Sequence, residues 1–600
     1  MALKELPPQE EARDEHGRRI LSGAEQRRQN WQNLRYSAGR RLPFILLMTL
    51  LFFIVIAPIL MLVYASLISV PPRPGHEVSW SNFTLDNFAF ITSSNTITAT
   101  INSLTIGLFG TLFALLGGGA LAWLAARTDV PGRPLVQLAG IVPMFVSPLV
   151  GALAWSFIGS PSPTGYANLL MRELGLDVTV NLYSVSGIIF VFALYYIPYA
   201  FLFIYSALTL MNPELEEVAR VHGATIRKTA SFVTFPLVAP AILGSALLTF
   251  VLIIENFPVP QVLGTPSRIN TLPSFIFNLM NTAPSRPNEA AGVGLLLMLV
   301  MSVVIWIQRR IISAREYATV TGKGFRPRMI ELGKWRWPAF SFVAAYIMLA
   351  VVLPFFALFQ MAFRQHSFIQ DFWGLFDRTA FTMFHFNAVL DYAPFRIGLR
   401  NSIIASILTA VIGGALHLMM SYTVYRTKTP GRQWIEYVAM LPLAAPALVL
   451  GIGFLWTWLL LPFPLYGTLG ILVVAFAVRF MPQGFRSISS SILQVHRDLE
   501  ESAFVAGASR TRTTVEVTIP LIRSGVVSTM VLLLILSMRE LSAAIFLFTS
   551  NTRVLSVVIF DLWFSGVLAR AAAVSLIYAG LLLVVVMFAR RYLGVQGQER

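Results

Sequence analysis

The sequence predicts an all-α polytopic membrane protein of about twelve transmembrane helices, arranged as two homologous halves of six. Composition is the first reason, because 56% of the 600 residues are hydrophobic and only 12% are charged, unlike a water-soluble globule. Second, about twelve apolar stretches approach the ~20 residues that cross a ~30 Å hydrocarbon core. Third, polar segments between these stretches recur along the chain. Helices are expected because an open strand edge cannot be satisfied in lipid.

The apolar stretches also define the expected domains. These are a basic N-terminal segment at 1–42, a first half at 43–310, a basic linker at 311–337 and a second half at 338–600. Six spans are expected in each half. They cover 43–69, 98–125, 136–158, 185–210, 237–257, 291–308, 338–362, 401–425, 434–461, 467–485, 525–548 and 571–592.

Positive charge is distributed unevenly between the two sides of the membrane. With the N-terminus placed in the cytoplasm, the loops and tails on that side hold about 33 of the 45 Lys and Arg residues. This positive-inside pattern predicts cytoplasmic N- and C-termini, and it accounts for the net charge of +16 without nucleic acid as a partner. The chain has no cysteine, which excludes disulfides, thiolate metal sites and cysteine nucleophiles.

One polar loop occurs twice, each time between two apolar spans and after the fourth span of its half. The matching residues, all 284 positions apart, are Glu217, Ala219, Gly223 and Pro236 in the first copy and Glu501, Ala503, Gly507 and Pro520 in the second. A second matched pair of segments, 127–133 and 426–432, is 299 positions apart. The difference predicts a longer external loop in the first half, around 159–183.

Each copy of the loop is expected to form a short helix on the cytoplasmic side. Asn212 and Asp498 stand where a helix begins, and the two glycines are expected to end it in a left-handed turn. The two prolines are expected to begin the next span. Because a helix of about ten residues is marginal alone, its exposed apolar face favours docking into a groove on a soluble partner, with the two glutamates offering charge-assisted contacts. The alternative is an ordinary solvated loop, which the matched spacing of two copies disfavours.

The loop motif resembles the coupling loop in permease subunits of bacterial ATP-binding-cassette (ABC) importers, and the resemblance covers about residues 95–600. It implies a multi-pass inner-membrane transport subunit, not an enzyme, whose loops dock on two cytoplasmic ABC ATPase subunits. It also implies an external solute-binding protein as a partner. The chain has no G-x-x-x-x-G-K-[ST] motif, so we expect ATP to be used by the partner subunits and no cofactor in this chain.

Two fused halves, together with the segments 255–264 and 539–544, resemble the iron(III)-type importer permeases. This implies iron(III) as the solute. Related permeases for polyamines, aminoethylphosphonate, thiamine and oxyanions share parts of these segments, so those solutes stay open. The alternative of another class is a secondary transporter driven by protons or sodium, which leaves the repeated loop unexplained.

Ionisable residues within the spans indicate a candidate path. Glu255 and Arg539 each lie 19 residues after the proline of their loop, so a pseudo-twofold axis places them at one depth. Such groups are costly in a membrane and usually pair or line a water-filled path. We expect Glu255, Arg539 and Glu540 to form a charge cluster at the gate or near the path; a purely structural ion pair is the alternative.

The seven histidines show no ligand spacing, and we expect no metal site.

Overall fold

The computed structural model describes residues 42–74, 82–313, 329–366 and 368–598. Nearly all of the expected N-terminal segment and most of the expected linker lie outside these residues. Within them, nine helices are long and apolar enough to cross a membrane, and three bent helix pairs raise the number to twelve. Each expected span corresponds to one of these helices or pairs, and the described residues form no named strand. The predicted all-α fold is therefore confirmed.

The first half contains six membrane helices. They are Leu42–Ser66, which ends in α2 (Ala57–Ser66), α4 (Ser94–Arg127), the bent pair of Arg133–Phe145 with α6 (Pro148–Ile158), α8 (Val185–Leu210), α11 (Phe235–Ile254) and α14 (Pro287–Ser313). The bent pair starts with α5 (Arg133–Ala139). The short helices are α3 (Asp86–Ala89), α7 (Tyr166–Glu173), α9 (Glu214–Val221), α10 (Ile226–Thr229), α12 (Pro258–Gly264) and α13 (Leu272–Asn281).

The second half repeats this order. Its membrane helices are α15 (Arg336–Ile347) continued by α16 (Leu353–Phe363), α18 (Ala393–Leu408) continued by α19 (Gly414–Arg426), the bent pairs α20 (Gln433–Ala444) with α21 (Ala447–Leu460) and α22 (Leu469–Arg479) with α23 (Met481–Gln494), α26 (Ile519–Met538) and α28 (Leu568–Gln598). The short helices are α17 (Phe384–Asp391), α24 (Asp498–Val505), α25 (Arg510–Thr513) and α27 (Leu555–Phe564).

Proline produces the sharp bends. The chain turns by 98° before α6 and by 111° between α20 and α21. At both places the residue that precedes a proline, Ser147 or Ala445, is extended, because the proline ring disfavours helical backbone at the preceding residue. A third bend, of 58° before α23, was not predicted. Pro482 lies just after it, whereas the equivalent Pro198 lies inside the unbroken α8.

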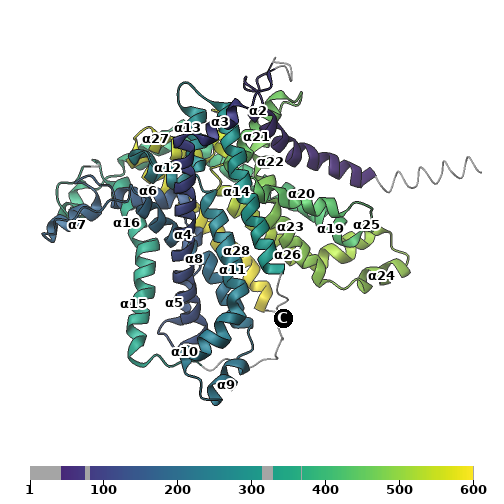
Figure 1. Cartoon of the computed structure of the whole chain (residues 1–600), viewed down its shortest axis with the longest axis horizontal. Coiled ribbons are helices and arrows are strands. Elements are labelled where there is room, and N and C mark those ends of the chain that lie inside the picture. Colours follow the sequence, from purple (N-terminus) through teal and green to yellow (C-terminus); the bar gives the residue numbers. More distant parts are fainter. Residues whose placement is uncertain (1–41, 75–81, 314–328, 367, 599–600) are drawn as a thin grey trace, which may run out of the picture.

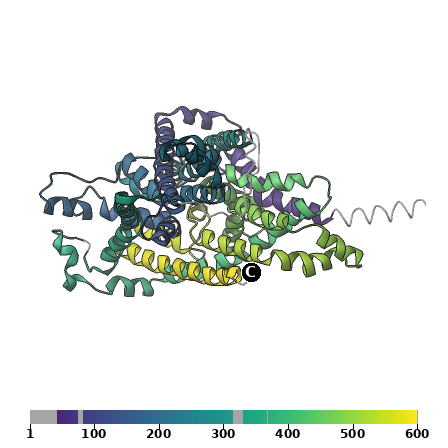
Figure 2. The same cartoon turned by 90° about the horizontal axis from the view of Figure 1, so that it is seen from below.

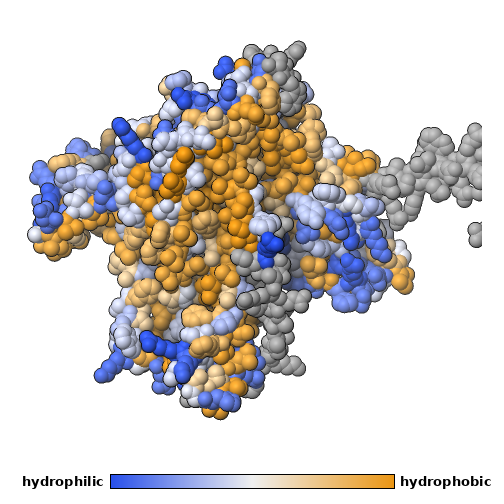
Figure 3. Space-filling model, in the orientation of Figure 1, coloured by the Kyte–Doolittle hydropathy of each residue, from blue (hydrophilic) through white to orange (hydrophobic). Residues whose placement is uncertain are grey.

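The two halves interlock. The first membrane helix of each half packs against the bent third pair of the other half, so that α2 contacts α21 and α16 contacts α6. The last helix of each half packs on its own first helix, α14 on α2 and α28 on α16. Figures 1 and 2 show the helices of the two halves crossing one another. Apolar side chains cover the middle of the molecule in Figure 3, with hydrophilic ones toward its extremities.

Candidate functional site

The duplicated loops (212–225 and 496–509) each carry one short helix, α9 or α24. In the first copy the backbone N–H of Glu214 donates to Asn212 Oδ1 at 3.0 Å, which satisfies a donor at the helix start. Both helices end at the predicted glycine, with φ of +83° at Gly223 and +88° at Gly507. At each end the next backbone N–H bonds back to the helix, from Ala224 to Ala219 at 3.0 Å in the first copy. A left-handed residue without Cβ thus ends both helices.

One face of each loop helix points to solvent. Glu217 and Glu501 are exposed, and so are Val221 and Val505, at 85% and 90%. Among the large hydrophobic side chains of the described residues these two exposures are the highest, and the two valines lie 284 positions apart. Figure 1 shows α9 with α10 at one extremity of the molecule and α24 with α25 at another. The exposed faces are therefore accessible to a partner.

The opposite face of α9 is tied to the membrane helices by a buried ion pair. Arg127, the last residue of α4, places its Nε 3.1 Å from Glu216 Oε2, and the two side chains are 2% and 15% exposed. Arg127 also donates to the Leu208 carbonyl at 2.8 Å. The Thr234 hydroxyl donates to Glu216 Oε1 at 2.7 Å. One carboxylate therefore joins the end of α4, the loop helix and the start of α11.

The second half repeats this arrangement. Arg426, the last residue of α19, lies 3.3 Å from Glu500, with side chains 4% and 8% exposed. Arg426 donates to the carbonyls of Ile492 and Val495 at 2.7 and 2.6 Å. The Thr518 hydroxyl donates to Glu500 Oε1 at 2.7 Å. We call each Arg–Glu–Thr set a loop anchor.

Sequence reasoning missed the loop anchors, although their signal was present. Arg127 and Arg426 begin the matched segments that are 299 positions apart. Glu216 and Glu500 immediately precede the two glutamates of the loop motif. Ionisable residues that recur at both offsets are candidates for pairing, but only the folded chain shows that the end of the second span reaches the loop.

The two prolines lie at the start of α11 and α26, but each helical span extends further back than expected. The spans are continuous from Ile226 to Ile254 and from Thr511 to Met538, so they start before the prolines. A five-residue π turn precedes α11 and another precedes α26. Proline lacks the N–H that would bond to the preceding turn, and a π bulge is one way in which a helix accommodates that loss.

A cavity of about 130 Å³ lies between the two halves. Glu255, Arg539 and Glu540 all line it. Its other lining residues come from both halves and include pairs at equivalent positions, such as Tyr196 with Phe480 and Leu252 with Leu536. The remaining ones are Ser147, Pro148, Tyr199, Asn256, Pro258, Ala447, Arg479, Leu541 and Ser542.

Glu255 pairs across the halves with Arg479, not with Arg539. The Arg479 and Glu255 side chains form a buried ion pair and are 9% and 7% exposed. Arg539 instead donates to the carbonyls of Met144 and Val146, at 2.7 and 3.3 Å, where the bent third pair of the first half is broken. Sequence reasoning missed Arg479 because it is the last residue of α22, beside the bend that was not predicted. The equivalent residue of the first half is Tyr195.

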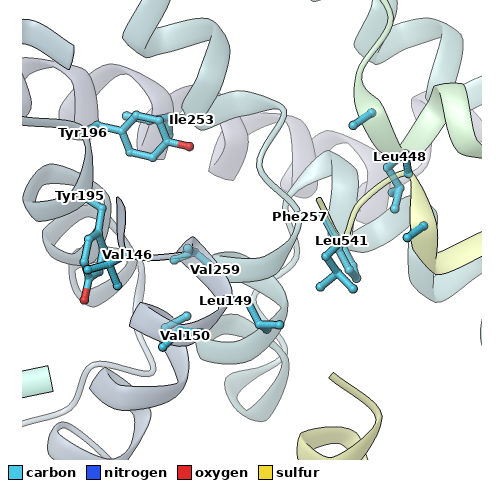
Figure 4. Close-up of a cluster of buried hydrophobic side chains, with 14 of the residues drawn as sticks. Val146, Leu149, Val150, Tyr195, Tyr196, Ile253, Phe257, Val259, Leu448 and Leu541 are labelled. Atoms are coloured by element: carbon cyan, nitrogen blue, oxygen red, sulfur yellow. The ribbon is translucent and has the colours of Figure 1, made fainter. Parts of the chain in front are cut away.

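An aromatic cluster follows Glu255 along the chain and joins the halves. The Phe257 ring lies 4.9 Å from Phe277 and 5.6 Å from Phe560, and Phe277 lies 6.0 Å from Phe546. Figure 4 shows further buried apolar side chains around Phe257, among them Leu149 from the first half and Leu541 from the second.

Among the described residues, no group of three His, Asp or Glu side chains is placed to hold a metal ion.

The fold and the site therefore define a multi-pass membrane protein of two interlocked halves around a shared cavity that charged side chains line. The family described as "Binding-protein-dependent transport system inner membrane component" matches the chain twice, over residues 107–317 and 413–594. The chain belongs to this family, and it carries the family's domain once in each half.

The individual relatives described next are identical to this chain at 25–28% of the aligned residues. The chain is 26% identical to "Putative ferric transport system permease protein FbpB 1" of Haemophilus influenzae, over 75% of this chain and 69% of that protein. It is 25% identical to "Ferric transport system permease protein FbpB" of Actinobacillus pleuropneumoniae, over 80% and 68%. It is 28% identical to "Putative 2-aminoethylphosphonate transport system permease protein PhnV" of Salmonella paratyphi A, over 44% and 99%. A crystal structure of a bacterial alginate-importing ABC transporter matches with a TM-score of 0.39 and 22% identity, over 47% of this chain and 99% of that one.

Proposed function

We propose that this chain forms the translocation path of an ATP-driven importer and is moved by two cytoplasmic ATPase subunits that bind the duplicated loops. A solute-binding protein delivers the solute on the other side, and ATP is used by the partners alone. Both termini lie in the cytoplasm of a bacterium, and the chain spans its inner membrane. Glu217, Ala219 and Gly223, with Glu501, Ala503 and Gly507, form the docking surfaces.

The loop anchors are the observation that carries this proposal. A loop that was simply exposed to solvent at the membrane surface would need no buried ion pair beneath it. In both halves the face opposite the anchor is exposed, while the anchor joins the loop helix to two membrane helices. Because charged groups buried as a pair resist separation, displacement of the exposed face moves the membrane helices with it.

The cavity and the aromatic cluster support an inward-facing arrangement. The phenylalanines join the halves. We place them on the external side of Glu255 because they follow the fifth span, and in that arrangement solute in the cavity is closed off from outside. When the partner subunits draw the two loops together, the halves rotate and the Arg479–Glu255 pair, which crosses between them, separates. Its two charges then become available to solute or water in the path.

Iron(III) is the solute that we propose first, since two of the most similar relatives are named as ferric permeases. Aminoethylphosphonate is the second candidate, because a shorter relative bears that name and two arginines line the cavity. Uptake of radiolabelled iron(III) and of labelled aminoethylphosphonate, in cells with and without the gene, separates the two. Uptake that stops when the proton gradient is collapsed at constant ATP would instead support the ion-coupled transporter.

The absence of cysteine permits a direct test of loop location. A cysteine at Val221 or Val505 is expected to react with a membrane-impermeant maleimide only in inverted vesicles. A control cysteine at Leu174, which is 60% exposed in the long loop of the first half, is expected to react only in intact spheroplasts. With a photocrosslinker at Val505, a nucleotide-hydrolysing subunit is the expected product. Labelling of Val221→Cys from outside would overturn the proposal.

A further inference from the structure

We propose that the crevice between α15 and the first half binds one anionic phospholipid from the leaflet on the side of the duplicated loops. Its acyl chains would lie between α15, α4 and α11, and its phosphate would lie at Arg227. Nothing in the transport proposal requires this site, so either can fail without the other.

The crevice is long and almost entirely apolar. One part has a volume of about 910 Å³ and a second part about 610 Å³, and Phe342 of α15 lines both. Side chains of α4, α11 and α15 form the walls of the first part, among them Leu112, Leu116, Trp123 and Phe235. Such a hollow inside a membrane is expected to hold hydrocarbon, because apart from Arg227 and Thr234 water there would face apolar side chains.

The length of the crevice matches one leaflet. It follows α15, whose twelve residues span roughly 18 Å at 1.5 Å per residue. One leaflet contributes about half of a ~30 Å hydrocarbon core. Figure 1 shows α15 at the edge of the molecule, beside α4 and α5. Its loop-side end packs on α5, and the π turn after it packs on α8, which leaves the stretch between them open.

Small residues of α4 keep the crevice open, and the second half lacks them. At Gly119 an added Cβ would have Ile204 as its neighbour at 3.7 Å, which is ordinary contact. Gly119 and Ala120 both line the hollow. The equivalent residues of the second half, 299 positions later, are Leu418 and Met419. The same fold therefore accommodates large side chains here, and the first half leaves the space free.

The loop-side rim of the crevice has the groups that recognise an anionic headgroup. Arg227 lines the hollow, and Lys228 next to it is exposed. Lys334 and Trp335, the latter 73% exposed, stand at the start of α15. The acidic residues at this rim are Glu331 and Asp129, and Asp129 pairs with Arg336 at 3.5 Å. With Arg227, Lys228 and Lys334 the rim still carries more positive than negative charge. Tryptophan is typical of the headgroup level, and each basic residue near an anionic membrane surface adds attraction.

The charge of the rim favours a lipid over a protein occupant. A second copy of the chain would bring its own basic loop to the same place, and like charges would meet. A zwitterionic lipid would fill the apolar hollow but gain less from the arginine and the lysines. An anionic phospholipid satisfies the apolar walls and the basic rim together.

Native mass spectrometry of the purified full chain, titrated with phosphatidylglycerol or phosphatidylcholine, tests the proposal. We expect one tightly bound phosphatidylglycerol per chain. The variant Arg227→Gln is expected to lower the preference for phosphatidylglycerol roughly fivefold, equivalent to ~1 kcal/mol for one basic residue. The double variant Gly119→Leu/Ala120→Met is expected to abolish retention of either lipid.

The matched control is Arg512→Gln, since Arg512 occupies the place of Lys228 in the second loop and pairs with Glu516 at 2.9 Å. It is expected to leave lipid retention unchanged. Because the Arg227 side chain is exposed, we expect Arg227→Gln to fold like the parent chain. Thermal unfolding shows whether the Gly119→Leu/Ala120→Met variant is also folded. Equal retention of both lipids, or unchanged retention in both crevice variants, would show annular lipid only. A dimer that dissociates in the filled variant would show that a second copy occupies the crevice.

Discussion

The loop anchor of the second half gives the sharpest prediction. The perturbation is Glu500→Gln, which keeps the shape of the side chain and removes its charge. Arg426 then loses its ion pair but keeps its bonds to the carbonyls of Ile492 and Val495. The neighbouring Glu501→Gln is the matched control, because Glu501 is exposed on the face that we assign to the partner.

The magnitude follows from burial. Removing one member of a buried ion pair typically costs 3–5 kcal/mol. Since the guanidinium keeps two carbonyl acceptors, we expect about 2–3 kcal/mol for Glu500→Gln. Glu216→Gln should cost less, about 1–2 kcal/mol, because the Glu216 side chain is 15% exposed against 8% for Glu500. Glu501→Gln should stay within about 0.5 kcal/mol of the parent chain.

Two measurements check these expectations. Unfolding of the purified chain in a denaturing detergent gives the change in free energy, and solute uptake gives the coupling. Glu500→Gln is expected to lower both, whereas Glu501→Gln lowers uptake alone. In a double-mutant cycle with Arg426→Gln, the coupling energy is expected to reach ~1–3 kcal/mol. A cycle without coupling, or a Glu500→Gln chain as stable as the parent, would refute the anchor as an energetic link.

The other predictions concern the cavity and the turns. In uptake assays, charge reversal at Glu255 alone or at Arg479 alone should abolish uptake. Reversal of both charges should restore part of the uptake. The same exchange between Glu255 and Arg539 should restore none. Gly507→Ala places a Cβ on a residue with φ of +88° and should destabilise the chain by about 1–2 kcal/mol, measured by detergent unfolding. Gly580→Ala, inside α28 with open space around it, should instead stabilise by up to ~1 kcal/mol.

Much of the fold was predictable from the sequence because the bilayer constrains it so strongly. Length and apolarity alone located the nine long helices and the three bent pairs of the described residues. The helix ends at Gly223 and Gly507 were predictable too, since few residues other than glycine adopt a left-handed turn. Pro236 and Pro520 do lie at the start of α11 and α26, but the extension of each span back through a π turn was not predicted.

The pairing of charges could not be predicted from the sequence. Equal spacing from the loops suggested that Glu255 faces Arg539, and both residues do line one cavity. Their partners depend on two local breaks in helices. One break exposes the carbonyls that Arg539 binds, and the other follows Arg479 at the end of α22. Pro198 and Pro482 occupy equivalent positions, yet only the second helix bends, so the sequence pattern alone does not decide the outcome.

The cavity also suggests why two halves in one chain are useful. Identical halves around a twofold axis would place like residues opposite each other, two Glu255 or two Arg539, and like charges in a buried site repel strongly. In the fused chain the halves differ at just these positions: Glu255 corresponds to Arg539, Asn256 to Glu540 and Tyr195 to Arg479. The loop anchors, which lie off the axis, are conserved between the halves in both residue type and geometry. Symmetry is therefore kept where two equivalent partners would bind and lost where a single path requires opposite charges to meet.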